Sequence, residues 1–194
     1  MNIPQVLHVC TGRAQPLQAA GGTVLSGIRK AALAGPVAAH SLGLQGDEQA
    51  DPTVHGGLSK AVYAYPAEHL PFWQTVRAQA GAQPWGEALP PGLFGENLLL
   101  QGLLETELWV GDRLMLPHCV LAVSEPRFPC FKFTAVMGFK QAAKMMVQSG
   151  FCGSYLAVLV PGQVQAGDAI ELQPGPREVN IRELFFSRVR PRRG

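Results

Sequence analysis

The chain alternates short apolar runs with turns that are rich in glycine and proline. Its 22 glycines and 16 prolines are spread over the whole length, and both residue types interrupt regular elements. This pattern favours a mainly β architecture, built from short strands and turns, over a helical bundle. The expected strands lie at residues 6–9, 61–64, 97–100, 120–123 and 155–160.

Two similar segments add further strands to this picture. In each, a Gly-Asp pair (Gly111-Asp112 and Gly167-Asp168) precedes a short apolar run, and this pair is typical of a turn. The second run alternates cleanly, which predicts a strand with Ile170 and Leu172 facing the core and Glu171 facing solvent.

Three segments have helical features. Apolar residues recur at helical spacing over 134–149, and Gly150 follows as a C-terminal cap. A second helix is expected from Pro66 to about residue 80, where Pro71 kinks it or delays its start. A third begins near residue 179 and continues to about 186.

The composition describes a compact globular chain. The 194 residues are 47% hydrophobic and 15% charged, which supplies a substantial core and argues against disorder. No domain boundary is visible in the first 172 residues. We therefore expect one domain over residues 1–175, followed by a short C-terminal helix and a basic tail over 176–194.

Charge and hydropathy exclude two classes of partner. A net charge of +2 is too small to predict nucleic acid as the main partner. No apolar run approaches the ~20 residues that a membrane-spanning helix requires, and the start of the chain lacks the pattern of a signal peptide. We expect a cytoplasmic protein with no nucleic-acid or membrane partner.

The four cysteines are widely spaced at positions 10, 119, 130 and 152, without a C-x-x-C pair. This spacing argues against a structural zinc site and a thioredoxin-type pair. Cys130 differs from the others because prolines 126 and 129 stiffen its loop and two cations, Arg127 and Lys132, lie nearby. Cations favour the reactive thiolate. The alternative is a buried, inert cysteine.

Other candidate residues gather in segments 26–30, 46–60 and 94–97. Paired glycines beside His55 allow backbone N–H groups to approach an anion, and Asn97 offers a donor and an acceptor to a heterocycle. The cations that could bind a phosphate are Arg29, Lys30, Lys60 and Arg127. The alternatives are an ordinary turn at Gly56-Gly57, a structural histidine, turn-forming roles for Asp47 and Asn97, and a solvated face for residues 29–30.

An ordered set of motifs covers most of residues 10–172: SGIRK (26–30), GLQGDEQAD (43–51), VHGG (54–57), AVYAYPAEHL (61–70), FGENL (94–98), VGDRL (110–114), VSEPRFPC (123–130) and AGDAIEL (166–172). In these motifs the chain resembles the MOSC family, named for the C-terminal domain of molybdenum cofactor sulfurase. It is most similar to the stand-alone bacterial branch associated with resistance to 6-N-hydroxylaminopurine. The resemblance implies a β-barrel with a few peripheral helices.

The resemblance also implies a ligand, the molybdenum cofactor (molybdopterin), with Cys130 as the molybdenum ligand. A soft thiolate suits that metal. The motif residues expected to line the cofactor pocket are Ser26, Arg29, Lys30, His55, Gly56, Gly57, Lys60, Asn97, Ser124 and Arg127. Members of this branch commonly continue into a C-terminal helical region, of which only the opening is present here.

The implied activity is the molybdenum-dependent reduction of N-hydroxylated small molecules, such as hydroxylaminopurines, amidoximes or hydroxylamines. His55 is the expected proton donor, with Asp51 as a second candidate. No flavin, haem or iron–sulfur motif is visible, so an external electron-donor protein is implied. Two alternatives remain open: a non-catalytic domain that binds or delivers the cofactor or carries sulfur on Cys130, and a hydrolase that pairs Cys130 with His55.

Overall fold

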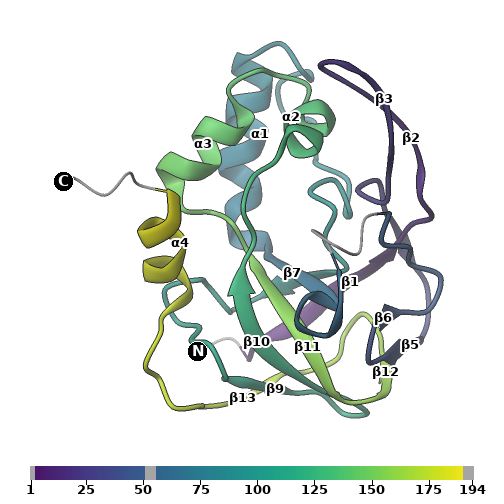
Figure 1. Cartoon of the computed structure of the whole chain (residues 1–194), viewed down its shortest axis with the longest axis vertical. Coiled ribbons are helices and arrows are strands. Elements are labelled where there is room, and N and C mark those ends of the chain that lie inside the picture. Colours follow the sequence, from purple (N-terminus) through teal and green to yellow (C-terminus); the bar gives the residue numbers. More distant parts are fainter. Residues whose placement is uncertain (1–2, 51–55, 190–194) are drawn as a thin grey trace.

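A computed structural model describes residues 3–50 and 56–189. This part of the chain is mainly β, with four α-helices and two short 3-10 helices (Figure 1). The strands are β1 (Gln5–Thr11), β2 (Gln15–Ala19), β3 (Gly22–Ser26), β4 (Ala31–Leu33), β5 (Val37–His40), β6 (Gly43–Leu44), β7 (Val62–Pro66), β8 (Leu98–Gln101), β9 (Arg113–Met115), β10 (Val120–Pro126), β11 (Ser154–Val160), β12 (Gly162–Val164) and β13 (Glu171–Gln173). The helices are η1 (Leu58–Lys60), η2 (Ala67–His69), α1 (Leu70–Gln79), α2 (Phe131–Met137), α3 (Ala142–Ser149) and α4 (Ile181–Val189).

Eight strands form one large mixed sheet in the order β13-β9-β10-β11-β7-β8-β1-β4. All neighbouring pairs are antiparallel except β7 and β8, which are parallel. The sheet curls until its ends approach each other: Gln5 forms a bridge with Ala169, and the N–H of Val6 donates to Asp168 O at 2.9 Å. No continuous ladder joins the two edges, so the expected barrel is confirmed only as a mainly β fold.

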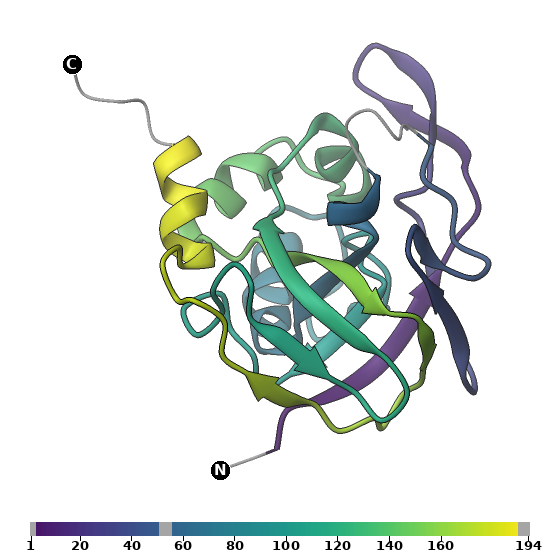
Figure 2. The ribbon, with the colours of Figure 1, turned by 60° about the horizontal axis from the view of Figure 1, so that its bottom comes forward.

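Two small sheets flank the large one. Strands β2 and β3 form a hairpin that extends away from the body of the molecule (Figure 2). Strands β12, β5 and β6 form the other small sheet. Most side chains of the hairpin and of β4 are exposed, so these strands have no apolar alternation that the sequence could reveal.

The core has two parts. One is aliphatic and lies within the curled sheet, around residues such as Leu98, Leu114 and Leu121. The other is aromatic and lies between the sheet and the helices; in it, the Trp73 ring packs edge-on against Phe133, with centroids 5.6 Å apart. Burial of each such side chain stabilises the fold by roughly 1.5–3 kcal/mol.

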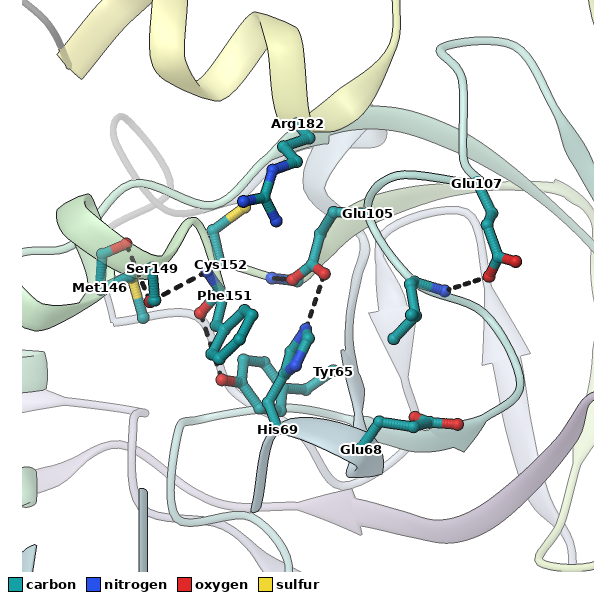
Figure 3. Close-up of polar contacts among 12 residues, drawn as sticks. Tyr65, Glu68, His69, Glu105, Glu107, Met146, Ser149, Phe151, Cys152 and Arg182 are labelled. Carbon is teal, nitrogen blue, oxygen red and sulfur yellow. Dashed lines mark hydrogen bonds and ion pairs between the residues drawn. The ribbon is translucent and has the colours of Figure 1, made fainter. Parts of the chain in front are cut away.

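A buried polar pair joins three segments at the edge of the aromatic core (Figure 3). Nε2 of His69, at the end of η2, lies 2.7 Å from Oε2 of Glu105. The other carboxylate oxygen of Glu105 accepts a hydrogen bond of 2.7 Å from the N–H of Gly153, just before β11. The ring of His69 stacks on Phe151 at 3.8 Å. This pair therefore fixes η2 and the start of β11 to the loop that carries Glu105.

The prediction of one helix over 134–149 is wrong. The segment forms two helices, α2 and α3, because Gly138 caps α2 in the left-handed conformation (φ 76°) and turns the chain. Gly150 is the expected cap of the second, with φ 74°. The delayed start at Pro71 is confirmed, since a 3-10 turn precedes α1. The third predicted helix is α4.

The strand predictions are confirmed, with shifts of at most three residues at their ends: β1, β7, β8, β10 and β11 are the five apolar runs, and β9 and β13 follow the two Gly-Asp turns. Within residues 3–50 and 56–189, none of the helices has the length and apolar character needed to cross a bilayer.

Candidate functional site

Four segments that are far apart in the sequence surround one pocket. They are the β3–β4 connection, the loop after β6, the loop before β8 and the loop from β10 into α2. With its open mouth included, the pocket spans about 620 Å³. Its lining residues are Ser26, Gly27, Ile28, Lys30, Asp47, Glu48, Gln49, Ala50, Lys60, Tyr63, Phe94, Gly95, Asn97, Arg127, Cys130, Lys132 and Tyr155.

Cys130 is the cysteine that reaches this pocket. It ends the loop after β10 in an extended conformation (φ −133°, ψ 172°) and directly precedes α2. The other three cysteines are buried, and burial raises the pKa of Cys10 to about 12 and that of Cys119 to about 11. Because a thiol must be accessible and ionised to bind a metal or attack an electrophile, Cys130 is the candidate among the four.

Arg127 lies beside Cys130 with only 4% of its surface exposed. Its guanidinium carbon is 5.2 Å from the centre of the Tyr63 ring and 4.9 Å from that of Phe133. Within the described part of the chain, no carboxylate forms an ion pair with it. Burying a cation without an acid is costly, and the aromatic faces compensate only in part. The pocket therefore presents a preorganised positive charge to an anionic ligand.

Two phenols stand close to this cation. Burial raises the pKa of Tyr63 and of Tyr155, and Arg127 opposes the shift in both. Both groups are consequently protonated at neutral pH. The Tyr63 hydroxyl donates to Cys152 O at 2.8 Å, so it fixes the chain, while Tyr155 is a hydrogen-bonding group of the pocket wall.

A buried network around Asp47 forms another part of the wall. Lys30 and Asp47 form an ion pair, with only 7% and 5% of their side chains exposed. The carboxylate of Asp47 also accepts hydrogen bonds of 2.9 Å from Asn97 Nδ2 and from Gly12 N. The N–H of Asp47 donates to Leu44 O at 3.1 Å, as its turn-forming interpretation expects. Its carboxylate nevertheless holds Lys30 in the pocket, which the sequence interpretation missed.

Asn97 is a structural hub as well as a wall residue. Its Nδ2 donates to Cys10 O at 3.2 Å in addition to Asp47, and its Oδ1 accepts from Tyr63 N at 3.0 Å. Both donor hydrogens are thus occupied, and only one lone pair of Oδ1 is left for a ligand. The expectation that Asn97 offers a donor to a heterocycle disagrees with this geometry.

Glu96 was not singled out from the sequence, although it lies in the FGENL motif. It is fully buried and accepts hydrogen bonds from Gly92 N at 2.6 Å and from Phe94 N at 3.0 Å. Burial raises its pKa to about 7, against the opposing effect of these donors and of Lys30. Its position shows that it shapes the loop that carries Gly95 and Asn97 into the pocket.

The paired glycines Gly56 and Gly57, expected to form an anion-binding loop, lie outside the pocket wall. The N–H of Gly57 donates to Gln49 Oε1 at 3.3 Å. Gly57 has a φ of 86°, so glycine is needed there for the turn. Gln49, another residue that the sequence interpretation missed, also donates to Lys60 O at 3.3 Å. It thereby ties η1 to the pocket.

The remaining predicted residues divide into three groups. Ser26 and Lys60 reach the pocket; Ser26 Oγ accepts from Ile28 N at 3.2 Å, and Lys60 Nζ lies 3.8 Å from Glu125. Arg29 and Ser124 do not reach it. Asp51 and His55 lie outside the described residues.

Both displaced residues have other surroundings. Arg29 is exposed and lines a neighbouring groove with Pro90 and Val136. The Ser124 hydroxyl lies within hydrogen-bond distance of the carbonyl oxygens of Ser59 and Tyr155. It joins η1 to β10 and β11, which is a structural role.

The match to the MOSC domain covers residues 51–171. Over 185 residues the chain is 37% identical to "Uncharacterized protein YflK" of Bacillus subtilis, which covers 95% of this chain and 79% of that protein. It is 34% identical over 158 residues to "Protein YiiM" of Escherichia coli, covering 81% and 68%.

A longer relative and a solved structure complete the comparison. The chain is 36% identical over 188 residues to a protein of Gibberella moniliformis named "Reductase", covering 94% of this chain but only 32% of that protein. The crystal structure of YiiM from Geobacillus stearothermophilus superposes with a TM-score of 0.72 at 27% identity, covering 94% of this chain and 82% of that one. The chain belongs to the MOSC domain family.

Proposed function

We propose that this protein binds the molybdenum cofactor in the pocket beside Cys130 and reduces N-hydroxylated compounds with it. The observation that supports this most is the pairing of Arg127 with Cys130. A buried cation without an acidic partner lies next to the accessible thiol of the chain. A ligand that carries both an anionic group and a soft metal would use both.

The other pocket residues fit such a cofactor. Lys60 and Lys132 add positive charge to the wall, and the cofactor carries a terminal phosphate. Within residues 3–50 and 56–189, no group of three His, Cys, Asp or Glu side chains could hold a metal ion. In the proposal Cys130 is the protein ligand of the metal, and the organic cofactor supplies the other ligands.

When bound, the cofactor supplies two-electron redox chemistry at molybdenum. The overall reaction consumes two electrons and two protons, cleaves the N–O bond of R–NHOH, and releases R–NH2 and water. The protein residues have to bind, orient and protonate. Cys130 would hold the metal, and Arg127 and the lysines would hold the anionic group. Tyr155 would orient ligands through its protonated hydroxyl.

The proton donors proposed from the sequence are His55 and Asp51. Their motif positions support this role, since in the sequence both fall between the pocket residues Ala50 and Lys60. The relative named "Reductase" supports an oxidoreductase. Because this chain matches only 32% of that protein, an electron supply outside the MOSC region is the simplest arrangement.

Turnover of 6-N-hydroxylaminopurine by cofactor-loaded protein tests the proposal. With reduced viologen as the electron source, wild type should form adenine, and Cys130→Ser should lose the activity. Cys119→Ala is the matched control, since Cys119 is a buried cysteine in a different part of the core. Equal rates in wild type and Cys130→Ser would overturn the role of Cys130.

The accessible thiol also supports a second candidate function. A thiol beside a cation in an open pocket could carry sulfur or hold the cofactor for delivery without turning over substrate. Stable cofactor binding without reduction of any N-hydroxylated substrate would favour this candidate over the reductase.

A further inference from the structure

The helical face beside the pocket mouth has a charge pattern that the cofactor site does not use. Between Glu125 and Asp168 the chain contains no acidic residue. The same stretch contains three lysines on or next to α2 and α3: Lys132, Lys140 and Lys144. The charged residues that α2, α3 and their connection contribute to this α2–α3 face are therefore all cationic, although the net charge of the whole chain is only +2.

These lysines are available to a partner. Lys140 and Lys144 are exposed, and neither forms an ion pair with a carboxylate in the described part of the chain. Lys140 lies in the turn just before α3, and Lys144 lies in the first turn of that helix. Neither lines the pocket, so a bound cofactor would leave both charges unneutralised.

The same face carries an exposed aromatic residue at the mouth. Phe131, the first residue of α2, is 53% exposed and directly follows Cys130. Leu58, the first residue of η1, is also exposed, with 64% of its surface accessible, and it precedes the pocket residue Lys60 by two positions. An exposed aromatic side chain beside cationic residues is suited to a protein interface.

We infer that the α2–α3 face, with Phe131 at its inner edge, docks an acidic one-electron carrier protein that reduces the cofactor. The inference rests on the proposed function, which needs electrons from outside the chain. Electron transfer weakens steeply with distance, so a productive carrier must approach the metal ligand. Docking on Phe131 brings the carrier to the residue next to Cys130.

The charge pattern fits this kind of partner. Complementary charge raises the association rate and orients the partner, while a small interface allows rapid release. Each encounter oxidises the carrier by one electron, so two encounters supply the electron pair that one N–O cleavage consumes. The two protons come from solvent through the pocket. A long polyanion would also be attracted to these lysines, and the experiment separates the two.

The test uses cofactor-loaded full-length protein with reduced bacterial flavodoxin, an acidic carrier, as the probe. Lys140→Glu and Lys144→Glu should each lower kcat/KM for flavodoxin about threefold to tenfold at low salt, and the loss should shrink as salt is raised. Arg113→Glu is the control: it makes the same change in net charge on the exposed face of β9, which Figure 1 places at the opposite end of the molecule from α2 and α3. Phe131→Ser should raise KM for flavodoxin at every salt concentration.

Reduced viologen separates this inference from the proposed function. With viologen all four variants should turn over 6-N-hydroxylaminopurine at the wild-type rate and keep the wild-type molybdenum content. Loss of viologen-driven turnover in wild type would refute the reductase itself. The docking face would be overturned if flavodoxin drove turnover at the same rate in the lysine variants, in Arg113→Glu and in wild type. Absence of transfer from flavodoxin in all of them would overturn it too. The docking face for a carrier would also be overturned if the lysine variants lost salt-dependent binding to duplex DNA or anionic vesicles while their flavodoxin-driven rates stayed unchanged.

Discussion

Replacement of Arg127 by methionine separates an anion-binding cation from a structural one. Methionine has a similar length and keeps much of the packing against Tyr63, Phe133 and Met146. The change removes two ring contacts, each worth about 0.5–1 kcal/mol. It also removes a buried charge without an acidic partner, and replacement of buried ions by apolar groups is often stabilising by about 1–4 kcal/mol.

The two contributions nearly cancel or favour the variant. Arg127→Met should therefore change the free energy of unfolding of cofactor-free protein by an amount between about 1 kcal/mol of destabilisation and about 3 kcal/mol of stabilisation. Anion binding should weaken, since a hydrogen bond to a charged group contributes about 1.5–3 kcal/mol. That corresponds to a loss of roughly tenfold to hundredfold in affinity.

Urea unfolding and calorimetric titration with inorganic phosphate measure the two effects on the same protein. Arg113→Met, on the exposed face of β9, is the control for the loss of one positive charge. An Arg127→Met protein destabilised by more than 2 kcal/mol, with unchanged phosphate affinity, would refute the reasoning. Arg127 would then be a structural cation held by its aromatic neighbours.

Three further changes test the fold around the site. Glu105→Ala should lower the free energy of unfolding by about 3 kcal/mol because it leaves two buried polar partners, His69 and the Gly153 N–H, unsatisfied. Glu107→Ala is the control and should lower it by less than about 1 kcal/mol, since Glu107 makes an exposed hydrogen bond (Figure 3). Equal losses for the two variants in urea unfolding would contradict this prediction. Folding raises the pKa of Glu96 from 4.5 to about 7, so the folded state binds an extra proton between these two pH values. Protonation of Glu96 therefore contributes about 3 kcal/mol to stability below pH 4.5, and this contribution is lost as the pH rises to 7. Glu96→Gln should remove that slope, and parallel stability–pH curves would disprove it. Gly138→Ala should cost about 1–2 kcal/mol, because φ is 76° and the new Cβ would lie 3.3 Å from Ala82; an unchanged thermal midpoint would exclude strain there.

The strands that the sequence predicted are those with a strong apolar signal. Residues 120–123 and 155–158 of these runs are half or fully buried in the large sheet. The hairpin β2–β3 and the edge strand β4 were missed because most of their side chains are exposed. Their backbone pairing leaves no periodic trace.

The helical segment was misread for a different reason. The apolar spacing continues across Gly138, and a single glycine inside a helical pattern is often tolerated. Here the glycine adopts a left-handed conformation and the chain turns between α2 and α3. Local spacing could not distinguish these two outcomes.

The pocket residues were found where a motif marked them and missed where long-range bonds define them. Arg127 and Cys130 stood out through the prolines and cations of one loop. Asp47 was taken as a turn former because its bonds go to Gly12, Lys30 and Asn97, which are distant in the sequence.

At the paired glycines, composition and structure point to different roles. They have the composition of an anion-binding loop, but the Gly57 N–H already donates to Gln49. Which backbone donors are free is decided by the tertiary structure, so composition alone could not settle it.

The most direct measurement is the molybdenum and pterin content of protein expressed in a host that makes the cofactor. Wild type and Cys119→Ala should contain molybdenum and fluorescent oxidised pterin in near-stoichiometric amounts, and Cys130→Ala should lose the metal. Wild-type protein that contains neither species, from a host shown to load another molybdoenzyme, would contradict cofactor binding beside Cys130.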